Sequence, residues 1–174
     1  MSEPFFEFLR EPNRESFLAA RRAVLEHPSY QPYSTELEDL DGLIEQEDYQ
    51  GVLDRMPQLV PNLVLSPRLH LMLAYTQRQL GNTDSADMEG AIARACADGI
   101  LMTGDGSAEK PWLVLRTSDE YDVLMFIDKK MENQALVRRD GKALDRLMCE
   151  DGSEVWFDVS DAMNSLGKQL RQSP

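Results

Sequence analysis

Apolar and small residues in the first hundred positions recur at a regular interval, which is the separation of Leu40 from Ala74. The same interval separates Val52 from Ala86 and Leu59 from Ala93, and we call it the repeat interval. Its length is typical of stacked supersecondary units, each of which buries its apolar face against the next. Asp48 and Asn82, which are also one repeat interval apart, are of residue types that favour the N-cap of a helix. The sequence therefore predicts antiparallel helical hairpins with the three alanines buried where helices cross.

The segment Leu73–Ala93 resembles the tetratricopeptide family, which has small residues at helix crossings and a glycine between its two helices. Gly81 is that glycine here, and it would supply the positive φ that closes a helix. The earlier copy departs from the pattern, because Glu47 replaces the glycine and Pro57 is expected to interrupt the second helix. The resemblance covers residues of about 33–100 and implies peptide or protein binding on a concave helical face.

A further helix is expected ahead of the repeats. Asn13 is suited to cap a helix over Arg14–Leu25, and His27 before Pro28 should end it, since the residue before a proline avoids the helical region. One repeat interval back from Val52 and Leu59 lie Leu18 and Leu25, so this helix is a candidate for half of a third unit.

The pattern changes after Ile100. Two Asp-Gly pairs, Asp140-Gly141 and Asp151-Gly152, predict hairpin turns because a type I′ turn needs positive φ at both central residues. We expect an antiparallel meander with strands at Gln134–Arg139, Lys142–Cys149 and Glu154–Val159. We also expect a strand at Trp112–Arg116, a helix at Ser118–Ile127 capped by Ser118, and a terminal helix at Asp161–Leu170.

The fold class that follows is α+β. Tetratricopeptide-like helical hairpins in residues 1–103 would pack on a small C-terminal antiparallel β-meander, with one or two helices, in residues 104–174. The second module should not be stable alone, because a sheet of this size needs a helix over its apolar face.

The join between the two parts carries a second resemblance. The segments Gly104–Ser107, Lys110–Pro111 and Ser118–Tyr121 are similar to the signature of an uncharacterised bacterial family, a domain of unknown function. In that family a helical-repeat half precedes a small module that opens with a Gly-Asp-Gly segment. The similarity covers residues of about 65–160 and implies no particular activity.

Charge and composition restrict the partners. The net charge of −13 disfavours binding to nucleic acid and to anionic membranes, because phosphate binding needs a basic face. No apolar run approaches the roughly 18 residues that a membrane span requires. The N-terminus has early acids and no basic region, so we do not expect a secretory signal. Cys96 and Cys149 form no CxxC pair, which favours a reduced compartment, and we expect a cytoplasmic location.

An acidic helix is the first candidate binding surface. The predicted helix Thr35–Asp48 carries acids and no base, and like charges on one helix repel each other. We expect a protein or peptide to be recognised either by Glu38, Asp41 and Glu45 of this helix, in which case the partner is basic, or by a groove near Tyr75 and Arg78. The alternative interpretation is a solvated helix face with no partner.

Carboxylates at the start of the helix Ser118–Ile127 are the second candidate. Acids in the first turn suit the positive end of the helix dipole, so Asp119 and Glu120 are expected to be solvated. If they are instead buried, their pKa values could separate and support acid–base chemistry. The candidate pocket, expected between the two halves, would be lined by Asp105, Asp119, Glu120 and Tyr121.

Other motifs predict no chemistry. The segment Gly104–Ser107 lacks the lysine spacing of a phosphate loop and the alternating acids of a calcium loop, which favours a simple turn. A histidine that acts as a catalytic base needs an orienting carboxylate and a nucleophile within reach, and the sequence shows no such constellation for His27 or His70. We therefore predict no catalytic residue, metal site or cofactor. The leading hypothesis is a non-enzymatic interaction scaffold, and the alternative is an enzyme or small-ligand-binding protein.

Overall fold

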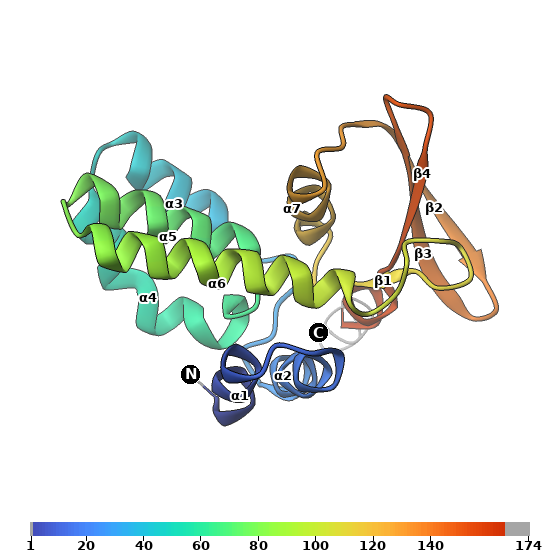
Figure 1. Cartoon of the computed structure of the whole chain (residues 1–174), viewed down its shortest axis with the longest axis horizontal. Helices are drawn as coiled ribbons and strands as arrows, with labels where there is room; N and C mark the ends of the chain where they lie inside the picture. Colours follow the sequence, from blue (N-terminus) through green and yellow to red (C-terminus); the bar gives the residue numbers. More distant parts are fainter. Residues whose placement is uncertain (1, 166–174) are drawn as a thin grey trace, which may run out of the picture. The chain divides into compact units, whose positions relative to one another are not determined.

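The computed structural model describes residues 2–165, which belong to two compact units (Figure 1). The first unit comprises Met1–Tyr30 and Ser34–Cys96, and the second comprises Gln31–Tyr33 and Ala97–Pro174. Helices dominate the first unit and the strands lie in the second, so the predicted α+β class is confirmed. The boundary between the units lies inside helix α6 (Thr83–Leu101), ahead of the boundary predicted at 103/104.

Helices form the first unit throughout. They are α1 (Glu3–Arg10), α2 (Arg14–Glu26), α3 (Glu36–Glu45), α4 (Tyr49–Leu63), α5 (Pro67–Gln79) and the greater part of α6. The second unit contains β1 (Trp112–Leu113), α7 (Ser118–Phe126), β2 (Met131–Arg139), β3 (Lys142–Cys149) and β4 (Glu154–Asp158). Of the predicted terminal helix Asp161–Leu170, residues up to 165 are helical, and the rest lie outside the described residues.

The second helix was predicted from the sequence, and the first was not. Asn13 caps α2 as expected, accepting bonds from the backbone N–H groups of Glu15 and Ser16, while Ser16 completes a reciprocal capping box. α1 is a short helix whose buried Phe8 packs edge-on against Phe17 of α2, with ring centroids 5.3 Å apart. This aromatic contact joins the two helices, because each covers the apolar side of the other.

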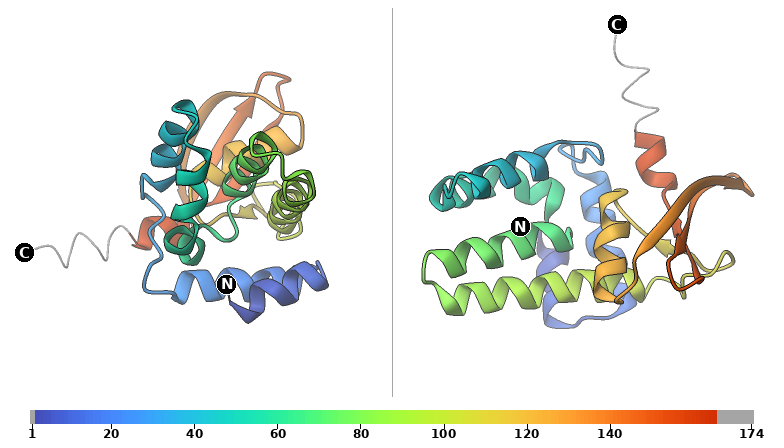
Figure 2. Two further views of the ribbon diagram at one scale, coloured as in Figure 1. Left: turned by 90° about the vertical axis from the view of Figure 1, so that its left-hand side faces the viewer. Right: turned by 90° about the horizontal axis from the view of Figure 1, so that it is seen from above.

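The two turns that separate α3 from α4 and α5 from α6 have the same backbone bonds, shifted by the repeat interval. Asp48 N–H donates to Leu43 O, and Asn82 N–H donates to Gln77 O, each at 2.9 Å. The residue before each of these adopts positive φ, 58° at Glu47 and 81° at Gly81. Glu47 therefore takes the left-handed conformation that Gly81 provides in the later copy. The recurrence in the sequence is thus a recurrence of hairpin geometry (Figure 2).

Burial follows the recurrence with one exception. Val52 and Ala86 are fully buried, as are Leu59 and Ala93, but Ala74 is only half-buried, which corrects the prediction for that residue. The core of α3, α4 and α5 consists of Leu37, Leu40, Val52, Leu59, Leu63, Leu69, Met72 and Leu73.

α4 continues through Pro57 and Pro61, so the expected interruption at Pro57 was wrong. A proline inside a helix costs about 3 kcal/mol through its missing N–H and its ring. Leu59 and Leu63 lie beyond Pro57 and are buried in the core, and full burial of a leucine contributes about 1.5–3 kcal/mol. The helix persists because the apolar side chains after the proline offset its cost.

The sheet of the second unit has the order β1-β4-β3-β2. The three predicted strands pair antiparallel as expected, and β1 adds a short parallel strand beside β4, which makes the sheet mixed rather than a pure meander. Gly141 and Gly152 both have positive φ, as predicted. Asp140 shares the positive φ of a type I′ turn, but Asp151 does not, so the second hairpin has a different turn.

The segment Gly104–Ser107 forms a structural loop. The N–H groups of Asp105 and Gly106 both donate to Lys110 O, and Gly106 O accepts from Trp156 N–H of β4. A side chain at Gly106 would meet the ring of Trp112 at 2.7 Å, and its φ is +74°, so glycine is required there. The glycines of this segment allow a close approach to the sheet, in agreement with the expected turn.

Candidate functional sites

The acids at the start of α7 are buried, which corrects the expectation that they are solvated. Asp119 is 1% exposed, Glu120 is 0% exposed and Asp122 is 3% exposed. The predicted cap is also wrong, because Ser118 is the first helical residue and the N-cap Thr117 makes no side-chain cap bond. α7 lies over one face of the sheet (Figure 2), so its first turn faces the interior of the unit instead of solvent.

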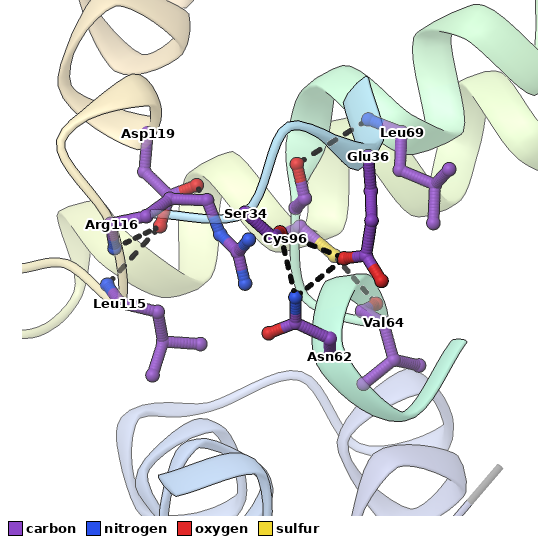
Figure 3. Close-up of polar contacts among 10 residues, drawn as sticks. Ser34, Glu36, Asn62, Val64, Leu69, Cys96, Leu115, Arg116 and Asp119 are labelled. Atoms are coloured by element: carbon purple, nitrogen blue, oxygen red, sulfur yellow. Dashed lines mark hydrogen bonds and ion pairs between the residues drawn. The ribbon is translucent and has the colours of Figure 1, made fainter. Parts of the chain in front are cut away.

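Asp119 organises the chain that leads into α7 (Figure 3). Its Oδ2 accepts bonds from the backbone N–H groups of Leu115, at 3.1 Å, and Arg116, at 3.2 Å. Its Oδ1 lies 3.7 Å from Nε of Arg116, which is itself 3% exposed. Asp119 thus satisfies buried backbone donors and balances a buried guanidinium.

Glu120 belongs to a separate cluster on the side of α7 that faces the sheet. The side-chain amide of Gln134 donates to Oδ2 of Asp145 at 2.8 Å and to Oε2 of Glu120 at 3.2 Å. The Tyr121 hydroxyl donates to Oε1 of Gln134 at 2.6 Å. Two buried carboxyl groups, one amide and one phenol therefore form a connected network, which we call the carboxyl cluster: Glu120, Tyr121, Gln134 and Asp145.

Several acidic side chains of the second unit have pKa values above their ordinary values. Burial, reinforced by Asp145, raises the pKa of Glu120 from 4.5 to about 9, so Glu120 is protonated at neutral pH. Burial also raises the pKa of Asp119 from 3.8 to about 7, and Arg116 opposes that shift. Burial, with the charges of Glu120 and Asp145, raises the pKa of the hydroxyls of Tyr33 and Tyr121. A carboxyl pair that shares a proton beside two phenols could store or transfer a proton.

The predicted pocket residues do not form one group. Glu120 and Tyr121 lie in the carboxyl cluster, and Asp119 is held by Arg116 and the backbone before α7. Asp105 is exposed and accepts a bond from the N–H of Ser107 within its own loop, and the bonds from Ser107 lower its pKa. Among residues 2–165, no group of three or more acids, histidines or cysteines is placed to hold a metal ion.

Gln134 and Asp145 were not among the residues predicted from the sequence. A signal for Asp145 was present, since it alternates with Ala143 and Leu147 on the apolar face of β3. A charged residue on a core-facing position indicates a buried polar network. No comparable signal marked Gln134, which lies on an edge strand with mixed burial.

The predicted binding residues of α3 lie on one side of the helix. Glu38, Asp41 and Glu45 are exposed and follow a spacing of three and four residues, next to the buried stripe that contains Leu37 and Leu40. None of the ion pairs described for residues 2–165 involves these three acids. Their charges therefore face solvent.

α5 carries the other two predicted binding residues, and their surface borders that of α3. α3 packs beside α5, and Asp41 and Tyr75 occupy equivalent positions one repeat interval apart. Tyr75 is 47% exposed, and its ring lies edge-on to Tyr49 with centroids 6.2 Å apart. Arg78, one turn further along α5, pairs with Asp87 at 2.9 Å. We call this surface the acidic–aromatic face: Glu38, Asp41, Glu45, Tyr49, Tyr75 and Arg78.

Two polar networks inside the first unit are structural. Buried Asn62 donates to Oε2 of Glu36 at 2.6 Å and to Oγ of Ser34 at 3.1 Å, so Glu36 belongs to the interior (Figure 3). His70 is 3% exposed and is bonded through Nδ1 to Glu89 and through Nε2 to Val64 O. Because a carbonyl can only accept, Nε2 of His70 carries a proton. Both of its ring nitrogens are thus occupied by structural bonds.

A family model described as a domain of unknown function, DUF4919, matches residues 26–168. The chain belongs to the DUF4919 family. No curated protein and no solved structure matches the chain significantly. The DUF4919 match includes the Gly-Asp-Gly segment, as the resemblance predicted, and extends beyond the expected range of 65–160 to take in α3 and α4. Assignment of the hairpins to the tetratricopeptide family stays a prediction.

The DUF4919 match covers some helices and strands of the chain and not others. α1 and all but the end of α2 precede it, so α3–β4 is the part that the family shares. Both the acidic–aromatic face and the carboxyl cluster lie inside the matched residues. Within residues 2–165, no helix combines the length and the hydropathy that crossing a bilayer requires.

Proposed function

We propose that this protein is a non-enzymatic interaction scaffold whose tetratricopeptide-like hairpins bind a protein or peptide that carries basic residues. The observation that carries the proposal is the acidic–aromatic face: three exposed acids lie on α3, and an exposed tyrosine lies on α5, which packs against α3. Acids provide long-range attraction for a basic partner, and an exposed aromatic ring provides apolar contact once the partner is bound.

The repeat geometry supports this proposal. Hairpins that recur at the repeat interval place equivalent positions of α3 and α5 side by side, so Asp41 and Tyr75 present their side chains in one row. An extended or helical segment lying across that row would meet charge and aromatic surface together. Such a partner would be met in the cytoplasm, where the free cysteines Cys96 and Cys149 remain reduced.

The test compares two double variants with the same change of charge. Glu38→Lys with Glu45→Lys removes two acids from the acidic–aromatic face, while Glu26→Lys with Asp98→Lys replaces two exposed acids on α2 and α6. Association rates are measured by surface plasmon resonance against binders from an array of Lys- and Arg-rich peptides. The proposal predicts about tenfold slower association for the first variant only, with the difference fading as salt rises.

A third variant separates attraction from contact. Tyr75→Ala should leave the association rate nearly unchanged and speed dissociation, since an aromatic anchor acts after encounter. Equal association rates for both charge variants, or an array with no binder, would contradict the proposal.

The second candidate function is an enzyme or small-ligand-binding protein that uses the carboxyl cluster. The observation that favours it is the buried pair Glu120 and Asp145, with a raised pKa at Glu120, beside the partly exposed Tyr121. A fragment screen by NMR would test it. A ligand that shifts the resonances of Gln134 and Tyr121, and whose affinity is lost in Glu120→Gln, would favour this function over the scaffold.

A further inference from the structure

β2 is the outer strand of the sheet and leaves one edge open. In the sheet order β1-β4-β3-β2, β2 is paired with β3 alone within the described residues. β2 runs over nine residues, whereas the opposite outer strand, β1, has two. A long open strand presents a row of backbone donors and acceptors that can pair with another strand.

The direction of these backbone groups follows from the pairing of β3. Ala143 O accepts from Val159 N–H at 3.0 Å, so the backbone groups of Ala143 turn away from β2. By alternation, Lys142, Leu144 and Arg146 turn toward β2, where their partners are Arg139, Val137 and Ala135. The remaining residues of the strand, Gln134, Leu136 and Arg138, therefore direct their N–H and C=O groups to the open edge.

Apolar side chains border this edge. Leu136 is 49% exposed, and Tyr121 of α7 is 38% exposed. The bond from the Tyr121 hydroxyl to Gln134 holds the tyrosine beside the strand. Open backbone groups next to exposed apolar side chains mark an interaction surface rather than an ordinary solvated edge.

We propose that the β2 edge pairs antiparallel with β2 of a second copy of this chain, about a two-fold axis at Ala135. In this register Glu132, at the bulge that begins the strand, lies at the same end of the interface as Arg138 of the other copy, so two pairs of opposite charges come together about the axis. It also places the outward-directed groups of Gln134 opposite those of Leu136 in the second copy. Leu136 then lies beside Gln134 and Tyr121 of its neighbour, where its exposed side chain is covered.

Charge distinguishes this register from another one that the backbone allows. An axis at Leu136 also matches outward-directed groups, but it sets Glu132 opposite Asp140. Like charges directly opposite each other destabilise a strand pair. The strand is therefore complementary to itself about Ala135 and not about Leu136.

The shape of β2 limits the strength of the dimer. The register with β3 shifts between Met131 and Asn133, so Glu132 lies at a bulge and the regular edge starts at Asn133. Pairing over so few residues gives an interface at the small end of the usual range, and we expect a dissociation constant on the order of 10–100 µM.

Sedimentation velocity of the full chain tests the proposal. Over a protein concentration range of about 1–500 µM, which spans such a dissociation constant, the mass should rise from 19.8 kDa toward twice that value. Glu132→Arg and Arg138→Glu should each weaken the dimer at least tenfold, and the double variant Glu132→Arg with Arg138→Glu should restore it. Glu26→Arg, an equal charge change at an exposed acid of α2, should leave it unaffected. A chain that stays monomeric, or a dimer that the single variants leave unchanged, would overturn the proposal.

Amide exchange provides the second readout. The N–H groups of Gln134 and Leu136 should become protected as concentration rises, whereas that of Ala135, which faces β3, should be protected throughout. Leu136→Pro removes one outward N–H without removing a donor to β3, so it should abolish the dimer and keep the monomer folded. If the protected amides lie elsewhere, or if Leu136→Pro dimerises like the parent chain, β2 is not the interface and the proposal is wrong.

Discussion

Acidic side chains in the first turn of a helix have different environments in the two units. α3 and α7 both carry acids in their first turn, Glu36, Glu38 and Asp39 in one case and Asp119 and Glu120 in the other. On α3, Glu38 and Asp39 are exposed, while on α7 both acids are buried. The same residue type at the same helix position thus has two environments, so position in a helix does not by itself determine solvation.

The difference comes from what each helix covers. α3 is buried along one side, which contains Leu37 and Leu40 with Leu43 and Ile44 beside them, and its opposite side faces solvent. On α7 the buried residues include Asp119, Glu120, Asp122, Val123 and Leu124, which occupy several sides of the helix. A helix covered on several sides must bury polar groups, and these need partners to offset their desolvation. The partners here are the backbone before α7 for Asp119 and Gln134 for Glu120.

Removal of a buried acid should cause the largest change in the free energy of unfolding. Asp119→Ala removes the oxygen that accepts from the N–H groups of Leu115 and Arg116, and it also removes the carboxylate that lies 3.7 Å from Nε of Arg116. Each unsatisfied buried donor costs about 1–3 kcal/mol, so the free energy of unfolding should fall by about 3–5 kcal/mol in urea titrations. Asp84→Ala, in the exposed first turn of α6, should change it by less than about 0.5 kcal/mol. Similar losses in both variants would remove the contrast between buried and exposed acids.

A buried acid with a raised pKa should make stability fall with pH. Glu120 has a pKa of about 9 in the folded chain and 4.5 as its ordinary value, so between these limits the folded state holds a proton that the unfolded state releases. Its contribution to stability is fully present below pH 4.5 and is lost as pH rises toward 9. Glu120→Gln cannot titrate, and it should gain about 2–4 kcal/mol relative to the parent chain between pH 6 and 8.

The measurement is urea unfolding of both chains at several pH values. Glu150→Gln, an exposed acid just after β3, provides the matched control and should follow the parent chain throughout. Parallel stability curves for Glu120→Gln and the parent chain would show that Glu120 is ionised in the folded state. The acids of the two units would then differ less in protonation than their burial implies.

Local sequence patterns predicted most of the fold. The carboxyl cluster could not be predicted from them, because it depends on contacts between residues that are distant in the sequence. The recurrence in the first unit and the Asp-Gly pairs predicted hairpins because turns depend on a few neighbouring residues. The persistence of α4 beyond Pro57 and the burial of Glu120 depend on what packs against them from distant positions. Asp119 and Glu120 were chosen as candidate residues, but their environment could not be predicted, because Gln134 and Asp145 reach α7 only through the sheet.

Replacement of an acid in a strained turn of the first unit should change the free energy of unfolding by a moderate amount. Glu47 adopts φ of 58°, which costs a residue with a side chain about 1–2 kcal/mol and costs glycine almost nothing. Glu47→Gly should therefore raise the free energy of unfolding by about 1 kcal/mol, despite the entropy that glycine adds to the unfolded chain. Glu45→Gly makes the same change inside α3 and should lower stability by about 1 kcal/mol. If both variants lose stability, Glu47 forms contacts that outweigh its strain, and the two turns are less alike than their bonds indicate.

Reversal of an exposed acid should have the smallest effect, and with the opposite sign to the change at Asp119. Glu45 lies in the last turn of α3, where a negative charge opposes the helix dipole, and it repels Asp41 four residues earlier. Glu45→Lys replaces that repulsion by attraction and places a positive charge at the favourable end, so stability should rise by about 0.5 kcal/mol. Glu45→Gln, which only removes the charge, should give about half of that gain. Both gains should nearly vanish in about 1 M salt, where the screening length falls to roughly 3 Å, as expected of a solvated charge. A loss of stability in Glu45→Lys, or a gain that salt does not reduce, would mean that Glu45 is held by an interaction within the chain. The acids of α3 would then be structural like those of α7, and the acidic–aromatic face would not be available to bind a basic partner.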